Sequence, residues 1–441
     1  MNIGAHQITR GTLIIAGIVI FIFLLLSLIF LGVLPGSRPA TPSQITLEFW
    51  GLFDGSAVWQ PIFDAYRKAN PNVFFNYVQK NPDTYERDLV EALASGKAPD
   101  IIMFHSSWLP KHGNKISPLP ETLMNMRNFQ ETFPDVATAD FVSQNKIYAL
   151  PVWTDVLAMF YNKDLFNAAG IAAPPKNWDD FIKVVKKLSA KDKFGNLTKS
   201  GAAIGAADNV NNASDILSLL MLQAGAKMIS DDGREAAFDR LVAVDGSRYN
   251  PGESALRFYT DFANPLSTAY AWNNNFQNSF DAFASGQTAI MLDYAVNMPR
   301  LKQRAPNLRL GVAPVPQLAN ASKFVNYADF WGYSVSSASK NSSAAWNFLI
   351  YLTGKDMNKY FSNTVSRPAS RRDVLSEEQS LPDIGIFAES ILSAANWYQV
   401  DPPAIDGIFK SMINAVVSGG AKPADAIADA AARVSSLMRK Q

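Results

Sequence analysis

The chain has 441 residues, more than one hydrophobic core usually holds, so we expect several structural units. Its 40 basic and 39 acidic residues nearly balance, which gives no electrostatic reason to expect nucleic acid as a partner. The absence of cysteine excludes disulfides, thiolate metal sites and thiol nucleophiles, and three scattered histidines do not predict a metal centre. We therefore expect neither a metal nor a cofactor.

The first feature along the chain is an uncharged apolar run, Leu13 to Leu34. Its 22 residues are long enough to span a bilayer core of roughly 30 Å as a helix. Arg10 precedes the run and no acidic residue does, which predicts a cytoplasmic amino end (1–12) and an extracytoplasmic remainder. The alternative is a cleaved signal peptide, whose apolar core usually has only about 7–15 residues. We expect an uncleaved transmembrane anchor in the cytoplasmic membrane, followed by a linker over 35–44.

A regular alternation of elements follows the linker. The pattern predicts strands and helices in turn, at 45–50, 58–69, 73–78, 85–94 and 100–104. Such an order is typical of a parallel, doubly wound α/β sheet, in which ligands bind beyond the carboxyl ends of the strands. Asp54 follows the first strand and Trp108 the third, so both are candidate ligand-binding residues. The alternative for Asp54, beside Gly55, is a turn former.

The stretch Ile147 to Phe166 is the predicted hinge of the protein. Pro151 ends an extended segment, and the apolar run 156–161 is typical of a strand that is covered on both faces. Between them lie Trp153 and Asp155, an aromatic ring and a carboxylate suited to a polar ligand with apolar faces. The alternative is that Trp153 fills a core and Asp155 caps a turn.

The rest of the chain continues the mixture of helices and strands. Asn177 is predicted to cap a helix with a core-facing stripe, and Pro423 to begin the last helix. Between them the pattern predicts strands at 200–206, 287–294, 308–314 and 333–337, a hairpin at 228–238, and helices at 213–225, 253–264, 276–283, 342–352, 356–362 and 405–417. Large aromatic residues stand at a strand end or in loops within this region, at Tyr294, Trp331, Trp397 and Tyr398.

The order of these segments resembles the extracellular solute-binding protein family of bacterial ABC importers, in the branch of maltodextrin- and other sugar-binding proteins. The resemblance is carried by ITLEFW, APDIIMF, LPVWTDVLAMFYNKDLFNAAGI, PPKNWDDFIKVVKKL, AFASGQTAIMLDY, LGVAPVP, FWGYSVSSASKNSSAAWNFLIYLT and IFKSMINAVVSGGAKPADAIADAA, over nearly all of 45–435. It implies a two-lobed, periplasmic-binding-protein-like α/β fold, each lobe a doubly wound sheet flanked by helices. A ligand cleft between the lobes, closure about a hinge and no enzymatic activity are further implications.

Two lobes require a division of the chain. We expect lobe 1 to comprise 45–150 with 287–322 returning to it, and lobe 2 to comprise 151–286 with 323–441 completing it. The expected crossing segments are Ala149–Val152, Gln287–Tyr294 and Val315–Phe324. The resemblance further implies a monomer whose partners are a small-molecule solute and the permease subunits of an ABC transporter.

By position within the motifs, the resemblance places the cleft-lining residues at Asp54, Trp108, Trp153, Asp155, Tyr294, Trp331 and Trp397 or Tyr398. The sequence departs from the family in two ways. The usual lipid-anchored cysteine is replaced by the apolar run, and the loop His105–Trp108 lacks the charged pair of some oligosaccharide binders. The second departure leaves the identity of the solute open.

The residue types favour a carbohydrate, either a mono- or an oligosaccharide. Aromatic rings stack on the apolar faces of sugars and carboxylates bind the hydroxyl groups, whereas binders of amino acids or anions need an arginine that the candidate loops lack. Two other functions stay open. A glycoside hydrolase would also use Trp and a carboxylate pair, such as Asp155 and Asp293. A membrane-tethered sensor or adhesin could use the same fold without transport.

Overall fold

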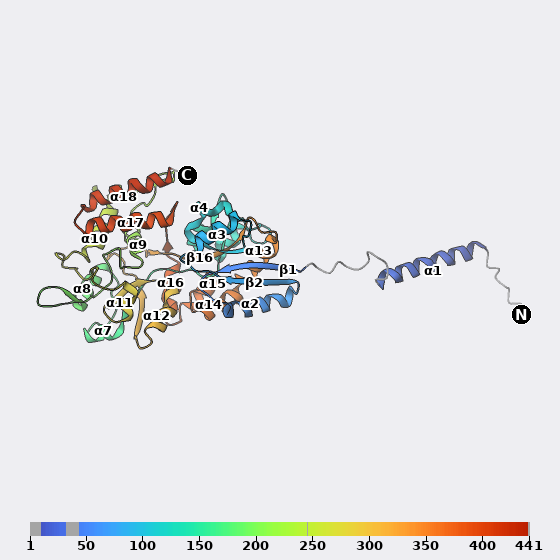
Figure 1. Ribbon diagram of the computed structural model, residues 1–441, viewed down its shortest axis with the longest axis horizontal. Helices are drawn as coiled ribbons and strands as arrows, with labels where there is room; N and C mark the ends of the chain where they lie inside the picture. Colours follow the sequence, from blue (N-terminus) through green and yellow to red (C-terminus); the bar gives the residue numbers. More distant parts are fainter. Residues whose placement is uncertain (1–9, 32–43, 245, 440–441) are drawn as a thin grey trace.

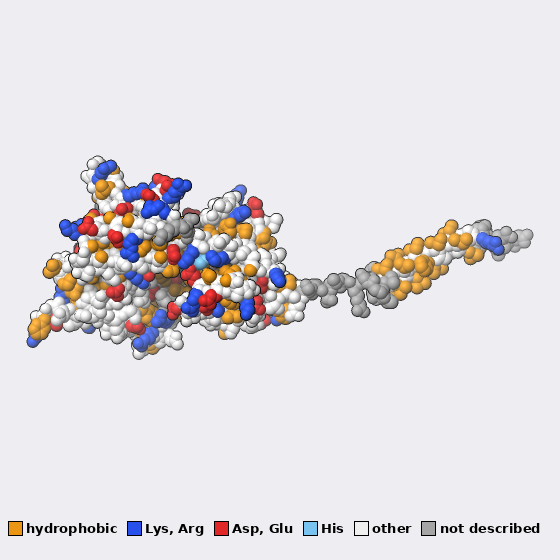
Figure 2. All heavy atoms as spheres, turned by 45° about the horizontal axis from the view of Figure 1, so that its top comes forward, with side chains coloured by type: hydrophobic (Ala, Val, Ile, Leu, Met, Phe, Trp, Pro, Cys, Tyr) orange, Lys and Arg blue, Asp and Glu red, His pale blue; other side chains and the backbone are white. Residues whose placement is uncertain are grey.

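The computed structural model of the protein describes residues 10–31, 44–244 and 246–439. Helix α1 (Arg10–Phe30) stands apart from an α/β body (Figure 1), and its surface is almost wholly hydrophobic (Figure 2). Within the described ranges α1 is the one helix long and apolar enough to cross a membrane, a property that a signal sequence shares. The last residues of the predicted span, 32–34, lie outside the described part of the chain.

The body has two halves that lie side by side (Figure 1). The first half is built on a sheet with the strand order β2-β1-β3-β16-β4, and β7 pairs with β16. β1, β2 and β3 run parallel, as the alternation of strands and helices predicts, whereas β16 is antiparallel to β3. The strands are β1 (Ile45–Gly51), β2 (Val73–Gln79), β3 (Ile101–His105), β4 (Ile116–Ser117), β7 (Leu150–Pro151) and β16 (Trp331–Ser336).

Helices cover this sheet through apolar faces. On α2 the buried residues Trp59, Ile62, Phe63 and Tyr66 recur at helical spacing, and Trp59 packs edge-on against Phe49 of β1 with 4.8 Å between ring centroids. The helices of this half are α2 (Ser56–Ala69), α3 (Tyr85–Ala94), α4 (Leu109–His112), α5 (Met126–Thr132), α6 (Asp135–Phe141), α13 (Ser342–Leu352), α14 (Lys355–Val365) and α15 (Arg372–Glu378).

The second half is built on a three-stranded sheet with the order β13-β8-β14. Its strands are β8 (Ala158–Asn162), β13 (Ile290–Asp293) and β14 (Leu310–Pro314), and both outer strands run antiparallel to β8. β8 is nearly all buried, which agrees with its apolar sequence. The helices of this half are α7 (Lys163–Ala168), α8 (Trp178–Leu188), α9 (Ala213–Gln223), α10 (Pro251–Asp261), α11 (Ser279–Ala284), α12 (Met298–Arg304), α16 (Ile384–Ile391), α17 (Pro402–Val417) and α18 (Pro423–Met438).

Short strands and turns complete the body. Asn177 caps α8 as predicted, because its side chain accepts a hydrogen bond from the amide of Asp180. Residues 200–206, a predicted strand, instead form buried irregular chain with a single bridge between Ser200 and Thr288. The remaining short strands are β5 (Val142–Ser143), β6 (Lys146–Ile147), β9 (Ala190–Lys191), β10 (Leu197–Lys199), β11 (Val242–Val244), β12 (Ser247–Tyr249), β15 (Asn326–Tyr327) and β17 (Ala394–Ala395).

The strand pairing corrects the predicted division of the chain. β13 and β14 pair with β8, so 287–322 does not return to the first half, and β16 belongs to the first sheet rather than to the second half. The second sheet is also antiparallel, not doubly wound. A strand's own sequence shows that it is buried, but not which strand it pairs with, and this is why the division was wrong.

The chain passes between the halves at three places: 152–157 after β7, 328–330 before β16, and 379–383 between α15 and α16. The first two crossing segments run antiparallel to each other, with a bridge between Val156 and Ala328. Of the predicted crossing segments, Ala149–Val152 overlaps the first. Gln287–Tyr294 and Val315–Phe324 stay within the second half, because they flank the paired strands β13 and β14.

Candidate functional site

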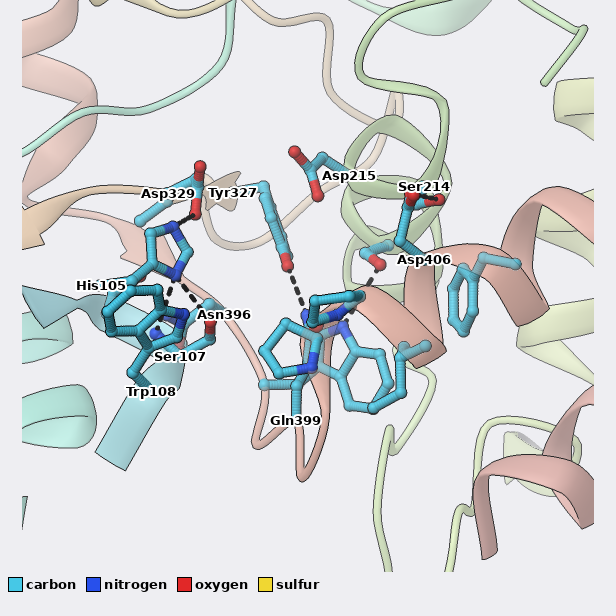
Figure 3. A pocket seen from close by; sticks show the side chains of 18 of the residues that line it. His105, Ser107, Trp108, Ser214, Asp215, Tyr327, Asp329, Asn396, Gln399 and Asp406 are labelled. Atoms are coloured by element: carbon cyan, nitrogen blue, oxygen red, sulfur yellow. Dashed lines mark hydrogen bonds and ion pairs between the residues drawn. The ribbon is translucent and has the colours of Figure 1, made fainter. Parts of the chain in front are cut away.

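A cavity of about 430 Å³ lies between the two halves, and a second cavity of about 510 Å³ adjoins it. We call the two together the cleft, because they share the lining residues Ser106, Ser107, Asn396, Trp397 and Gln399. Figure 3 shows the first cavity, with side chains from both halves around it. A concave site of this size and position is typical of small-molecule binding.

The wall from the first half is aromatic. Trp331 at the start of β16 pairs with His105 at the end of β3, and Trp108 follows in the next turn. The rings of Trp108 and Trp331 lie edge to face with 5.2 Å between centroids, and Tyr85 stacks behind Trp108. Aromatic side chains therefore lie at the carboxyl end of the buried strand β3, which is where a parallel α/β sheet is expected to bind its ligand.

The wall from the second half comes from α9, the loop after β17, and α17. Ser214, Asp215 and Ser218 lie on one side of α9, an otherwise apolar helix. Trp397 stacks on Phe409 of α17 with 5.7 Å between centroids, and its indole N–H donates to Ser218 Oγ at 3.3 Å. These contacts hold the Trp397 ring in one orientation at the edge of both cavities.

Polar side chains line both walls (Figure 3). His105 pairs through Nε2 with Asp329 at 2.7 Å and through Nδ1 with Ser107 Oγ at 2.6 Å. The hydroxyl of Tyr327 accepts a hydrogen bond from Gln399 at 3.0 Å. Amide, hydroxyl and carboxylate groups therefore face the same space as the aromatic rings, an arrangement suited to a ligand with both apolar faces and hydroxyl groups.

The cleft carries excess negative charge. Burial, together with the charge of nearby Asp329, raises the pKa of Asp215 to about 7. Burial also raises the pKa of Asp140 well above its usual range, although the Asn396 amide opposes this by donating a hydrogen bond at 2.6 Å. Among the described residues that line the cleft, His105 is the only basic one.

Four of the residues predicted from sequence lie at the cleft. Trp108 and Trp331 line the first cavity and Trp397 lines both. Tyr398 lines the second cavity, where 44% of its surface is exposed. The structure thus brings three tryptophans from distant parts of the sequence to one space, and their role in binding stays a prediction.

Asp54 and Trp153 do not line the cleft. Both carboxylate oxygens of Asp54 accept hydrogen bonds from Arg367, at 2.8 and 2.9 Å, and both residues are buried. Trp153 is buried against Phe361, and the Arg367 guanidinium lies 4.9 Å from its ring centroid. These positions agree with the alternative for Trp153, a core ring, and with a structural rather than a binding role for Asp54.

Asp155 also lies away from the cleft and is only 1% exposed. Its carboxylate accepts hydrogen bonds from the amides of Val156, Ala295 and Val296, at 2.8–2.9 Å. Asp155 therefore ties the first crossing segment to the turn Ala295–Asn297. A ligand cannot reach its carboxylate to form the predicted hydrogen bonds. Burial raises the pKa of Asp155 to about 7.

Tyr294 contributes indirectly, because its hydroxyl donates to Asp215 at 2.9 Å and so orients a carboxylate of the cleft. Asp293 beside it accepts hydrogen bonds from Asn212, Asn297 and the amide of Tyr294. Neither Asp155 nor Asp293, the carboxylate pair of the hydrolase alternative, lines the cleft. Over the described ranges, no group of three or more acidic or histidine side chains is placed to hold a metal ion.

The sequence analysis did not identify most of the polar residues of the cleft, including Asp140, Asp215, Tyr327, Asp329, Asn396, Gln399 and Asp406. For Asp215 a signal exists. It stands with Ser214 and Ser218 on an otherwise apolar helix, and three polar residues on one side of such a helix need polar partners or solvent. Of the others, Asp140 and Asp406 lie on α6 and α17, Tyr327 lies in the short strand β15, and Asp329, Asn396 and Gln399 stand in loops.

Known proteins share this sequence pattern and this fold. The family model described as bacterial extracellular solute-binding protein matches residues 52–359. A binding protein of Brucella abortus is 25% identical over 404 residues, which cover 87% of this chain and 92% of that protein.

Two solved structures share the fold at low sequence identity. An ABC transporter solute-binding protein of Thermotoga lettingae, bound with alpha-D-tagatose, has a TM-score of 0.71 and 24% identity over 90% of this chain and 100% of its own. The cyclic alpha-maltosyl-1,6-maltose binding protein of Arthrobacter globiformis has a TM-score of 0.75 and 18% identity over the same shares of the two chains. The family model spans well over half of the 441 residues. The chain therefore belongs to the bacterial extracellular solute-binding protein family, which is non-enzymatic.

Proposed function

We propose that the protein captures a carbohydrate in the cleft, on the extracytoplasmic side of the cytoplasmic membrane, and delivers it to the permease of an ABC transporter. The observation that carries the proposal is the composition of the cleft. Trp108 and Trp331 on one wall face Trp397 on the other, and carboxylate and amide groups lie between them. Rings stack on the CH faces of a sugar, while acceptors bind its hydroxyl groups.

The comparisons support this choice of solute. The two solved structures are described with tagatose and with a cyclic maltosyl saccharide, and both share the fold over nine tenths of this chain. Among the described residues that line the cleft there is no arginine, the side chain that recognition of a carboxylate or phosphate would favour, and the buried Arg367 is committed to Asp54.

Binding can be tested with a soluble form that begins at residue 41. We expect a glycan panel, read by thermal shift and by tryptophan fluorescence, to give at least one ligand that raises the melting temperature. For that ligand, Trp331→Ala or Trp397→Ala should each weaken binding by about 2 kcal/mol, roughly thirtyfold, because a desolvated stacking surface is lost.

The matched control is Trp50→Ala. Trp50 is a partly buried ring on β1 that does not line the cleft, so its loss should leave the affinity unchanged. If Trp331→Ala and Trp397→Ala bind as the wild type does, or lose affinity only in proportion to folding, the cleft is not the binding site. If no glycan of the panel binds, the proposal that the solute is a carbohydrate is contradicted.

We further propose that α1 remains on the mature protein as its membrane anchor. Its face in Figure 2 is largely hydrophobic, and it carries no charge after Arg10. Intact-mass measurement on native material checks this, with the full-length mass expected. A mature chain that begins near residues 37–40 would identify α1 as a signal peptide instead.

A further inference from the structure

The carboxylates of the cleft differ in whether a base neutralises them. Three of those that line the first cavity have basic partners: Glu86 pairs with Lys111 and His112, Asp329 with His105, and Asp406 with Lys410, all at 2.7–2.9 Å. Each of these three acids therefore has a basic partner within the protein.

Asp215 and Asp140 have no such partner. Asp215 accepts a hydrogen bond from the Tyr294 hydroxyl, and Asp140 accepts one from the Asn396 amide. In the described part of the chain, neither forms a salt bridge with Lys, Arg or His. The negative charge of nearby Asp329 disfavours the ionised form of each.

Asp215 and Asp329 approach the same space from different elements. Asp215 lies on α9 of the second half and Asp329 in the crossing segment 328–330, and Figure 3 shows the Tyr327 side chain between them. Ser106 lies at the boundary of the two cavities and is only 3% exposed.

A cationic group would complete this arrangement. It would neutralise the uncompensated charge at Asp215 by a charge-assisted hydrogen bond within the cleft. An anionic group would add like charge to a cleft whose described lining has one basic residue, and that residue is already paired with Asp329. A neutral sugar would leave the charge of Asp215 uncompensated.

We propose that the solute is an aminated carbohydrate, whose protonated amino group binds to the carboxylate of Asp215 in the cleft. This inference rests on the proposed function, since it names the class of carbohydrate that the same site selects. It makes Asp215 the residue that determines specificity, and it excludes uronates and sugar phosphates as ligands.

The test is calorimetric titration at pH 8, where Asp215 is ionised. The probes are maltotriose and cellotriose, the 6-amino-6-deoxy derivative of each, and the 6-carboxylate of each. Primary alkyl amines of this kind stay protonated at that pH, as the lysine amine does. We expect at least one amino derivative to bind about tenfold or more tightly than its neutral parent, the effect of one charge-assisted hydrogen bond. Neither carboxylate should bind.

Asp215→Asn should remove this preference, because the amide keeps an acceptor for the Tyr294 hydroxyl but lacks the charge. The matched control is Asp261→Asn, at a partly buried carboxylate on α10 outside the cleft, which should retain the full preference. A preference that survives Asp215→Asn would overturn the role of Asp215.

The outcomes separate this inference from the proposed function. If the neutral trisaccharides bind as tightly as their amines, or the carboxylates bind tightest, the inference fails and carbohydrate binding stands. If none of the six probes binds and the glycan panel also gives no ligand, the proposed function fails, and the inference fails with it.

Discussion

At the scale of single residues, the partners of a side chain decide what it can do. Asp54 in the first half and Asp215 in the second are both acidic residues, yet Arg367 occupies both oxygens of Asp54. Such a buried pair is costly to break from one side, because the remaining charge is left without compensation. Asp215 has only a hydroxyl partner, so its charge remains available to a ligand.

The uncompensated charge of Asp215 predicts a pH-dependent stability. Its pKa is about 7 in the folded protein and ordinarily about 3.8, so the folded state retains a proton that the unfolded state has lost between these pH values. The free energy of unfolding therefore falls as pH rises from about 4 to 7, and this contribution is constant above that range. Asp155 contributes a pH dependence of the same sign over the same pH range, since its pKa is also raised to about 7.

We expect Asp215→Asn to be more stable than the wild type at pH 8 by more than about 1.4 kcal/mol, the equivalent of one pKa unit. The difference should shrink towards zero at pH 4, where Asp215 is protonated in both states. Urea unfolding of the two proteins across this pH range measures the difference. The pH dependence that Asp155 adds to the free energy of unfolding is the same in both proteins, so it cancels in the difference. A variant that is less stable at pH 8, or a difference independent of pH, would contradict the account.

At the scale of elements, β16 brings the first sheet and the crossing segments together. Gly332, the neighbour of Trp331, packs closely against other parts of the first half: a Cβ there would lie 2.8 Å from the Phe141 ring and 2.9 Å from the Leu150 carbonyl oxygen. The glycine lets β7 approach β16, and β7 leads directly into the crossing segment 152–157.

Gly332→Ala should lower the free energy of unfolding by about 1–3 kcal/mol, because backbone on one side and a packed ring on the other must both move. The matched control is Gly407→Ala, within α17, where a Cβ meets nothing within 4 Å. Alanine there should stabilise the protein by about 0.5–1 kcal/mol through helix propensity. Urea unfolding checks both variants, and equal stabilities would show that β7 and β16 tolerate a wider spacing.

At the scale of the whole molecule, the two halves are joined by three crossing segments around one cleft. In the first two, the amide of Leu157 donates to Tyr327 O at 3.0 Å and the amide of Asp329 donates to Asp155 O at 3.2 Å. Paired strands of this kind keep the halves aligned while small changes in φ and ψ allow one half to rotate against the other. A ligand that touches both walls would favour the closed arrangement.

We expect ligand binding to shorten the distance between the halves. The cysteine-free chain permits a clean pair of spin labels at Asn114→Cys and Ser411→Cys, two exposed positions in different halves. Pulsed electron resonance should give a shorter mean distance with ligand than without. The pair Ser254→Cys and Ser411→Cys, within the second half, should not change. An unchanged distance in the first pair, at saturating ligand, would contradict closure.

Much of the local structure could be predicted from the sequence alone. The apolar helix, the strands β1, β2 and β3 with their helices, the cap at Asn177 and the last helix all follow from patterns within a dozen residues, where periodicity and capping act. The motif order also indicated the family, and it identified the three tryptophans that line the cleft.

What only the tertiary structure decided is which distant segments meet. The pairing of β13 and β14 with β8, and of β16 with β3, depends on contacts across more than a hundred residues, which no local pattern encodes. The same holds for the site. Asp54 is paired with Arg367 and Asp155 accepts hydrogen bonds from backbone amides, so neither lines the cleft, whereas Asp215 on α9 does. A carboxylate's role depends on its burial and its hydrogen-bond partners, and both arise only when the chain folds.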